Sequence, residues 1–258
     1  MHARDDTTRQ LTCVGLQRYL TLCAMPISDH FAGLVAERVA EARERIHAAV
    51  QRGGHGQAVT LVAVTKTHGI EAVEAAFMAG VADVGENRVQ EAEEKMKEAA
   101  QRALPVRWHL IGHLQRNKAR AAAAFGMVHG MDSERLAEAL DAAASSAGVV
   151  LDVLMQVNVS GESTKSGVVP GDVPSLAGRL MDLRNLRVLG AMTMAPFDAP
   201  ESVLRDVFRG ARHVREQLTQ AGHPASFLSM GMSGDYEIAV EEGATHVRLG
   251  TVLFGSRT

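Results

Sequence analysis

The chain has 258 residues, of which 46% are hydrophobic and 22% charged, and its formal net charge is -3. This composition is ordinary for a globular protein with a sizeable core, and the charge gives no reason to expect a nucleic acid or an anionic membrane as partner. The two cysteines, Cys13 and Cys23, cannot staple a domain of this size, and the eleven histidines lack metal-ligand spacing. We therefore expect a cytoplasmic protein without a metal site.

Residues 1–24 stand apart from the regular pattern that follows. Their apolar stretch is interrupted by Gln17 and Arg18 and preceded by two acidic residues, which argues against a signal peptide. The sequence also contains no apolar run long enough to span a bilayer. We expect residues 1–24 to form a poorly ordered extension, with Met25 as the natural start, and residues 25–258 to form one domain.

From Ser28 onward, segments with helical spacing alternate with short runs rich in β-branched residues. A helix is predicted from Ser28 to the Gly53-Gly54 pair, ahead of the first strand. The other predicted helices cover residues 70–80, the stretch ending at 98, 114–124, 133–147, 203–218 and 236–242. The eight predicted strands cover residues 59–65, 81–84, 106–111, 128–131, 149–159, 186–194, 227–230 and 245–249.

Eight strands alternating with helices over this length predict an α/β fold, a single TIM-type (β/α)8 barrel with an extra N-terminal helix. A doubly wound open sheet is the alternative, because strand counting does not distinguish the two. The first predicted strand is not followed by the glycine-rich dinucleotide fingerprint that would favour the open sheet.

The loops after the seventh and eighth predicted strands have the composition of a phosphate site. Each combines glycine, which lets the backbone approach an anion, with a hydroxyl: Gly231, Ser233 and Gly234 in one loop, Gly250 and Thr251 in the other. The predicted helix 236–242 would direct its positive end at this pocket. The alternative is that these glycines permit tight turns and the hydroxyls cap helices.

Lys66 follows the first predicted strand, at the mouth of the predicted barrel. A lysine there is ordinarily solvated or paired with a carboxylate such as Glu86. A lysine in a barrel mouth can instead lose its proton and attack an aldehyde, because desolvation and a nearby positive charge such as Arg248 disfavour the ammonium form.

Long segments of the sequence resemble the pyridoxal phosphate homeostasis proteins, barrels similar to the N-terminal domain of alanine racemase. The matching segments are LVAVTKTHG around Lys66, VGENRVQEAEEK, WHLIGHLQRNK, NVSGESTKSG and SMGMSGDYEIAVEEGATHVRLGTVLFG. The resemblance implies a barrel that holds pyridoxal 5′-phosphate (PLP) as a Schiff base on Lys66.

The resemblance also implies roles for other residues of the site. Ser233, Gly234, Gly250 and Thr251 would cradle the phosphate, Asn87 would approach the ring, and Arg248 would face the pyridine nitrogen. His109 and Met192 would line the pocket, or instead be a hydrogen-bonded core histidine and a core-filling methionine. Lys165, in the GESTKSG segment, is a candidate for a second phosphate contact.

A guanidinium opposite the pyridine nitrogen cannot accept a proton, which disfavours transaminase and decarboxylase chemistry. Three residues follow Gly255, so we expect no second domain of the racemase type. The resemblance therefore implies a monomeric, non-enzymatic protein that buffers or delivers PLP to PLP-dependent apo-enzymes. The basic segment of Arg116, Lys118 and Arg120 is a candidate docking surface, and the alternative is a solvated helix face. An amino-acid racemase of similar barrel type and a barrel for another phosphorylated metabolite are the alternatives.

Overall fold

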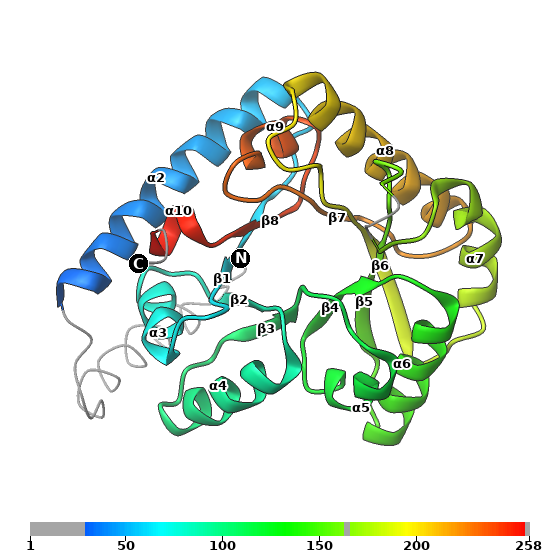
Figure 1. Ribbon diagram of the computed structural model, residues 1–258, viewed down its shortest axis with the longest axis horizontal. Coiled ribbons are helices and arrows are strands. Elements are labelled where there is room, and N and C mark those ends of the chain that lie inside the picture. Colours follow the sequence, from blue (N-terminus) through cyan, green and yellow to red (C-terminus); the bar gives the residue numbers. More distant parts are fainter. Residues whose placement is uncertain (1–28, 163–165, 256–258) are drawn as a thin grey trace, which may run out of the picture.

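The computed structural model describes residues 29–162 and 166–255, so the predicted extension 1–24 and the candidate phosphate contact Lys165 lie outside the described residues. Eight parallel strands pair in chain order, and β8 pairs with β1 to close a barrel (Figure 1). This confirms the predicted TIM-type fold and excludes the open sheet. The strands are β1 (Thr60–Val64), β2 (Asp83–Glu86), β3 (Arg107–Leu110), β4 (Met127–Met131), β5 (Leu151–Gln156), β6 (Leu186–Met192), β7 (Phe227–Ser229) and β8 (His246–Leu249).

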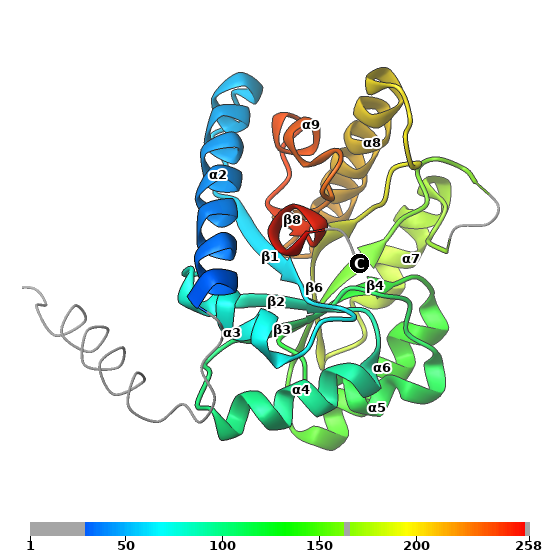
Figure 2. The same ribbon diagram turned by 60° about the vertical axis from the view of Figure 1, so that its left-hand side comes forward.

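Helices surround the barrel, and the extra N-terminal helix α2 packs across α3, α9 and α10 (Figure 2). None of the helices in the described ranges is both long and apolar enough to traverse a bilayer. The helices are α2 (Asp29–Gly53), α3 (Ile70–Met78), α4 (Val89–Gln101), α5 (Ala119–Ala122), α6 (Glu134–Ala147), α7 (Val173–Leu180), α8 (Glu201–Gln220), α9 (Tyr236–Glu241) and α10 (Thr251–Phe254), with 3-10 turns η1 (Arg116–Lys118) and η2 (Pro170–Asp172).

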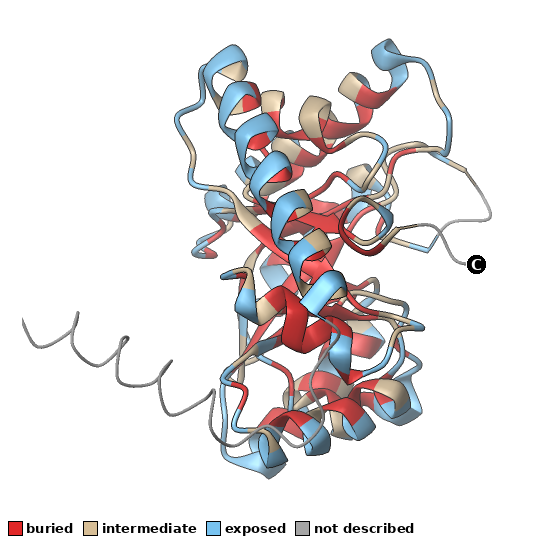
Figure 3. Cartoon of the chain, turned by 90° about the vertical axis from the view of Figure 1, so that its left-hand side faces the viewer, coloured by how far each residue is buried: buried red, intermediate tan, exposed pale blue. Residues whose placement is uncertain are grey.

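Alternation along the strands divides the core into two parts. In β1, Leu61 and Ala63 belong to the large cluster between the barrel and the helices, whereas Val62 and Val64 face the barrel interior. Burial is accordingly concentrated in the strands and on the inner faces of the helices (Figure 3). The interior holds a small apolar cluster built on Met127, Leu154 and Met192.

Several predicted boundaries need correction. The predicted strand 149–159 is shortened to β5, because Val149 and Val150 are exposed. The predicted helix 114–124 is divided into η1 and the one-turn helix α5. Two helices were not predicted, namely α7 and α10, since eight and four residues are too short to show a clear helical period.

Candidate functional site

Lys66 lies just after β1, at the mouth formed by the carboxyl ends of the strands. The preceding residue, Thr65, is fully buried, and its Oγ1 donates a hydrogen bond to the Glu86 carboxylate across 2.5 Å. Glu86 contacts α4, so both side chains lie between the strands and the helices. Because successive side chains alternate, Lys66 is placed on the opposite side, toward the barrel mouth, where it is half-buried.

Glu86, the carboxylate that the sequence offered as a partner for Lys66, pairs with a different lysine. Lys95 Nζ on α4 lies 2.7 Å from Glu86 Oε1 and donates a second hydrogen bond, also 2.7 Å long, to the Thr65 carbonyl. Burial raises the pKa of the Glu86 carboxyl, although the hydrogen bonds from Lys95 and Thr65 oppose the rise. The proposed pairing of Lys66 with Glu86 is therefore wrong. No carboxylate among the described residues forms an ion pair with Lys66.

The cluster of Lys95 and its carboxylates also holds the backbone of Thr67, the residue that follows Lys66. Thr67 has a φ of 66°, a left-handed conformation that is costly for a β-branched residue. Its N–H donates a 2.5 Å hydrogen bond to Glu91 Oε1, which in turn lies 3.1 Å from Lys95 Nζ. Lys66 is thus flanked by two backbone positions that Lys95 and its carboxylates hold in place.

The loops that follow β7 and β8 are joined by the hydroxyl of Ser233. Its Oγ accepts hydrogen bonds from the N–H groups of Gly250 and Val252, each across 3.3 Å. The backbone N–H groups of Ser233, Gly234 and Thr251 have no hydrogen-bond acceptor among the described residues. Unused N–H donors in adjacent turns form an anion-binding surface, so the two loops fit a phosphate.

Gly231 gives the first of these loops its shape. Its φ of 92° is unfavourable for other residues, and a Cβ there would press on Ala239 and on the backbone of Tyr236. By contrast, a Cβ at Gly234 would meet no atom within 4 Å, so open space adjoins that part of the loop. The loop is therefore tightly packed at its base and accessible at its exposed end.

Lys66 and the two loops share one mouth of the barrel. In the β1–β8 pairing, Ala63 lies opposite Leu249, one residue before Gly250. A Cβ on Gly250 would lie 3.5 Å from the Val64 carbonyl oxygen, close to the start of the Lys66 turn. A phosphate on these loops would therefore lie beside the amine-bearing turn.

Arg248 is buried in the barrel interior, where it is 4% exposed. Its Nη1 donates to Ser229 Oγ across 2.6 Å and its Nη2 to the Thr193 carbonyl across 3.0 Å. Burial lowers its pKa to about 10, with Asp235 acting in the opposite direction, so the guanidinium keeps its charge at neutral pH. These two hydrogen bonds use two of its five donors.

The remaining candidate residues fall into two groups. Asn87 follows β2, is half-buried and forms no side-chain hydrogen bond with any described residue, so its amide can meet a ligand. A Cβ on Gly112 would collide with the Asn87 backbone, so the loop after β3 passes directly against it. His109 and Met192 are instead a fully buried, hydrogen-bonded histidine and a member of the interior apolar cluster.

Sequence reasoning missed three side chains that shape this site. The role of Lys95 was not predicted, since its i,i+4 spacing from Glu91 does not reveal that it is buried. Ser229 and His129 were not singled out, although both lie at inward positions of β7 and β4. Alternation along those strands was the signal that could have found them.

The chain is similar to known proteins along most of its length. The model of the alanine racemase N-terminal domain family matches residues 38–258. Over 225 residues the chain is 41% identical to the pyridoxal phosphate homeostasis protein of Aquifex aeolicus, covering 86% of this chain and 97% of that one. It is 43% identical to the protein of that name from Pseudomonas aeruginosa, covering 86% and 96%. The chain belongs to the pyridoxal phosphate homeostasis protein family.

Solved structures agree with membership of the pyridoxal phosphate homeostasis protein family. The structure of PipY from Synechococcus elongatus with PLP bound is 37% identical, with a TM-score of 0.76, and covers 86% of this chain and 100% of that one. Alanine racemase from Corynebacterium glutamicum has a TM-score of 0.67 but only 14% identity, over 88% of this chain and 62% of that one. The racemase therefore shares the fold alone.

Proposed function

We propose that this protein holds PLP as a Schiff base on Lys66 and acts in intracellular PLP homeostasis, by buffering or delivery, without robust catalytic turnover. The observation that carries the proposal is a lysine that forms no ion pair with any described residue, placed beside two loops with backbone N–H groups that lack an acceptor among those residues. PipY, a relative of 37% identity over its whole length, binds PLP. The residues present fit both the aldehyde and the phosphate of that molecule.

The phosphate would lie on the loops after β7 and β8. Gly234 and Thr251 would donate their N–H groups, and the Ser233 hydrogen is available because its Oγ donates to none of the described residues. Gly250 allows the backbone of β8 to turn close to Val64. A dianionic phosphate would satisfy donors that otherwise depend on water.

The ring would lie between Asn87 and Arg248. The Asn87 amide has both a donor and an acceptor to offer, whereas the Arg248 guanidinium only donates. A ring nitrogen that accepts from Arg248 would stay unprotonated. The cofactor supplies an electrophilic aldehyde and a conjugated ring, and an unprotonated ring is a weaker electron sink.

Attachment to Lys66 requires no co-reactant. Lys66 loses a proton to solvent, and its neutral Nζ attacks the aldehyde carbon. A C=N bond replaces the C=O bond, and the aldehyde oxygen leaves as one water with both protons of the amine.

The non-enzymatic role is supported by Arg248 and by the names of the relatives, which are homeostasis proteins. We further propose a monomeric cytoplasmic protein that supplies PLP-dependent apo-enzymes. The exposed residues Arg116, Lys118 and Arg120 are the candidate docking segment. The paucity of cysteine fits a reducing compartment.

A spectral titration of apo-protein with PLP tests the proposal. We expect an absorption band in the near-ultraviolet to violet that disappears on borohydride reduction, which also fixes the cofactor mass to Lys66. Lys66→Ala should show no such band, while Lys97→Ala, an exposed lysine on α4, should behave as wild type. A wild-type protein that gains no band would overturn the proposal, as would sustained production of D-amino acids from L-amino acids.

A further inference from the structure

A line of polar side chains crosses the barrel interior from Asp83 to Arg248. His109 Nε2 lies 2.8 Å from Asp83 Oδ1, and His109 Nδ1 lies 2.9 Å from His129 Nε2. His129 Nδ1 is 2.8 Å from Ser229 Oγ, which also accepts the 2.6 Å hydrogen bond from Arg248 Nη1. Five residues from five strands thus form one continuous chain of hydrogen bonds.

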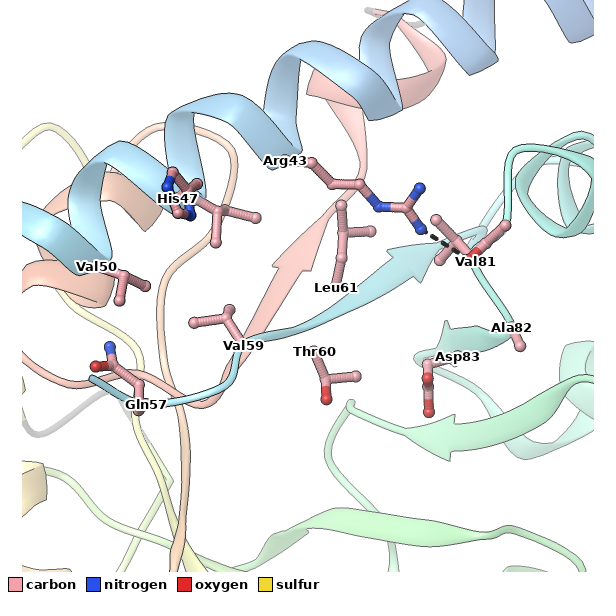
Figure 4. Close-up of a pocket in the computed structure, with 12 residues that line it drawn as sticks. Arg43, His47, Val50, Gln57, Val59, Thr60, Leu61, Val81, Ala82 and Asp83 are labelled. Atoms are coloured by element: carbon pink, nitrogen blue, oxygen red, sulfur yellow. Dashed lines mark hydrogen bonds between the residues drawn. The ribbon is translucent and has the colours of Figure 1, made fainter. Parts of the chain in front are cut away.

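The middle of this chain is sealed from water. His109, His129 and Ser229 are each 0% exposed. Asp83 is the first residue of β2, at the end of the barrel opposite Lys66. There it forms part of the wall of a groove of about 500 Å³ beneath α2, together with Arg43 and Thr60 (Figure 4).

When each imidazole carries one proton, the Asp83 carboxylate, which can only accept, sets one direction for the whole chain of hydrogen bonds. Arg248 can only donate, so Ser229 Oγ accepts from it, and in this direction the hydroxyl gives its own hydrogen to His129 Nδ1. His129 must then carry its proton on Nε2 and donate to His109 Nδ1. His109 in turn carries its proton on Nε2 and donates to the Asp83 carboxylate, which can only accept.

The charges are consistent with this assignment. Burial holds the pKa of His129 well below its ordinary value, and the charges of His109, His246, Arg248 and Arg107 act in the same direction, so His129 is neutral. Burial alone would raise the pKa of Asp83, but the hydrogen bond from His109 and nearby positive charges keep it below its ordinary value. The Arg248 guanidinium and the Asp83 carboxylate therefore stand at the two ends of the chain, with a neutral His129 between them.

We propose that Asp83, His109, His129 and Ser229 form a one-directional relay that positions the Arg248 guanidinium for the ring nitrogen of the cofactor. The role of the relay toward the cofactor rests on the proposed function, whereas the hydrogen-bonded chain itself does not depend on it. Ser229 Oγ and the Thr193 carbonyl each accept a hydrogen bond from one nitrogen of the guanidinium and so fix its orientation. Because the tautomer of His129 is fixed, Ser229 keeps its own hydrogen on His129 and does not rotate it toward Arg248. A residue at one end of the barrel thus determines how a donor is presented at the other.

The histidine tautomers test the relay in apo-protein without any substitution. Nitrogen NMR of the full-length protein with 15N-labelled histidine distinguishes protonated from bare imidazole nitrogens. We expect His129 to be neutral at pH 7.5 with its proton on Nε2, and His109 to carry a proton on Nε2, the nitrogen that faces the Asp83 carboxylate. A proton on Nδ1 of His129, or a positively charged His129, would overturn the assignment.

The cofactor-loaded protein tests the positioning role. We expect Ser229→Ala to load Lys66 but to shift both the absorption maximum and the pH at which the band changes, and to weaken PLP binding about tenfold. Ser229→Thr, which keeps a hydroxyl, should restore the wild-type band. His246→Gln is the matched control, because His246 lies in the same interior and bonds to Thr245 instead.

The outcomes separate the two proposals. If wild-type protein does not load on Lys66, the proposed function fails, while the tautomers of the apo-protein still decide whether the relay exists. If wild type loads and Ser229→Ala keeps its spectrum, pH profile and affinity, the positioning role is refuted. An equal change in Ser229→Ala and His246→Gln would also refute it, because the effect would then be one of general packing.

Discussion

Lys95 and Glu86 form a buried ion pair directly behind the strand end that carries Lys66, with Nζ and Oε1 2.7 Å apart. Lys95→Met would leave the Glu86 carboxylate buried without its cation. We expect the free energy of unfolding to fall by about 3–5 kcal/mol. Urea denaturation at pH 7.5 measures this loss.

The neighbouring lysine on the same helix provides the control. Lys97 is exposed, and Lys97→Met should change stability by less than about 0.5 kcal/mol. Adding Glu86→Gln to Lys95→Met should recover part of the loss, since no buried charge then remains. Similar losses in the two single variants would contradict a buried role for Lys95.

Ser233 determines how the phosphate loops meet. Ser233→Ala removes the acceptor for the N–H groups of Gly250 and Val252. We expect the dissociation constant for PLP to rise about tenfold or more, measured by absorbance titration. Pyridoxal, which lacks the phosphate, is the control ligand, and its weaker binding should change little. An equal effect on both ligands would argue against a phosphate site at these loops.

Gly231 and Gly148 both have a positive φ, but their surroundings differ. Gly148, after α6, has a φ of 67° but open space where a Cβ would lie, whereas Gly231 is crowded. Gly148→Ala should cost about 1 kcal/mol of stability from backbone strain alone. Gly231→Ala should cost about 1–3 kcal/mol more because of overpacking, in thermal or urea unfolding. Equal costs would show that the Ala239 contact relaxes freely.

The lowered pKa of His246 leads us to expect that the protein loses stability in mild acid. Burial lowers its pKa from 6.5 to about 4 in the folded protein. The unfolded chain therefore binds more protons than the folded chain below pH 6.5, and stability falls as the pH drops from 6.5 toward 4, by about 1.4 kcal/mol per pH unit for one proton. The charged and titratable groups that act on His246 are His109, Asp83, Arg107 and Arg248.

Urea midpoints at pH 7, 6 and 5 measure this slope. His246→Gln removes one of the titrating groups, so its stability should depend less steeply on pH than that of wild type. His129, whose pKa is also lowered, remains in the variant and leaves a residual slope. Superimposable pH profiles for wild type and His246→Gln would contradict the prediction.

The alternation of strands and helices was sufficient to predict an α/β fold with eight strands, whereas the choice of a closed barrel over an open sheet needed the chain length and the family resemblance as well. Capping signals were also informative: Ser133 Oγ accepts the Leu136 N–H at the start of α6, and Gly148 ends the helix in a left-handed conformation. Motif positions located Lys66, Ser233 and Arg248 near one mouth of the barrel. These features depend on local sequence, which is why they could be read directly.

The contacts between strands were not predictable in the same way. The Ser229–His129 contact joins residues 100 positions apart, and it depends on the register with which β7 and β4 face the interior. The burial of Lys95 could not be predicted, because its i,i+4 spacing from Glu91 fits an exposed pair equally well. Burial and register are tertiary properties, so the partners of Glu86 and Arg248 emerge only in the folded chain.

The pairing of β8 with β1 has a consequence for how the protein matures. Lys66 is carried by the first strand of the barrel, whereas Ser233 and Thr251 follow the last two strands. A ligand attached to all three spans the seam where the barrel closes, so it can be captured only after the last strand has docked. Bound cofactor would then link β1 to the loops after β7 and β8, so that the barrel opens more slowly and the folded protein is protected from proteolysis.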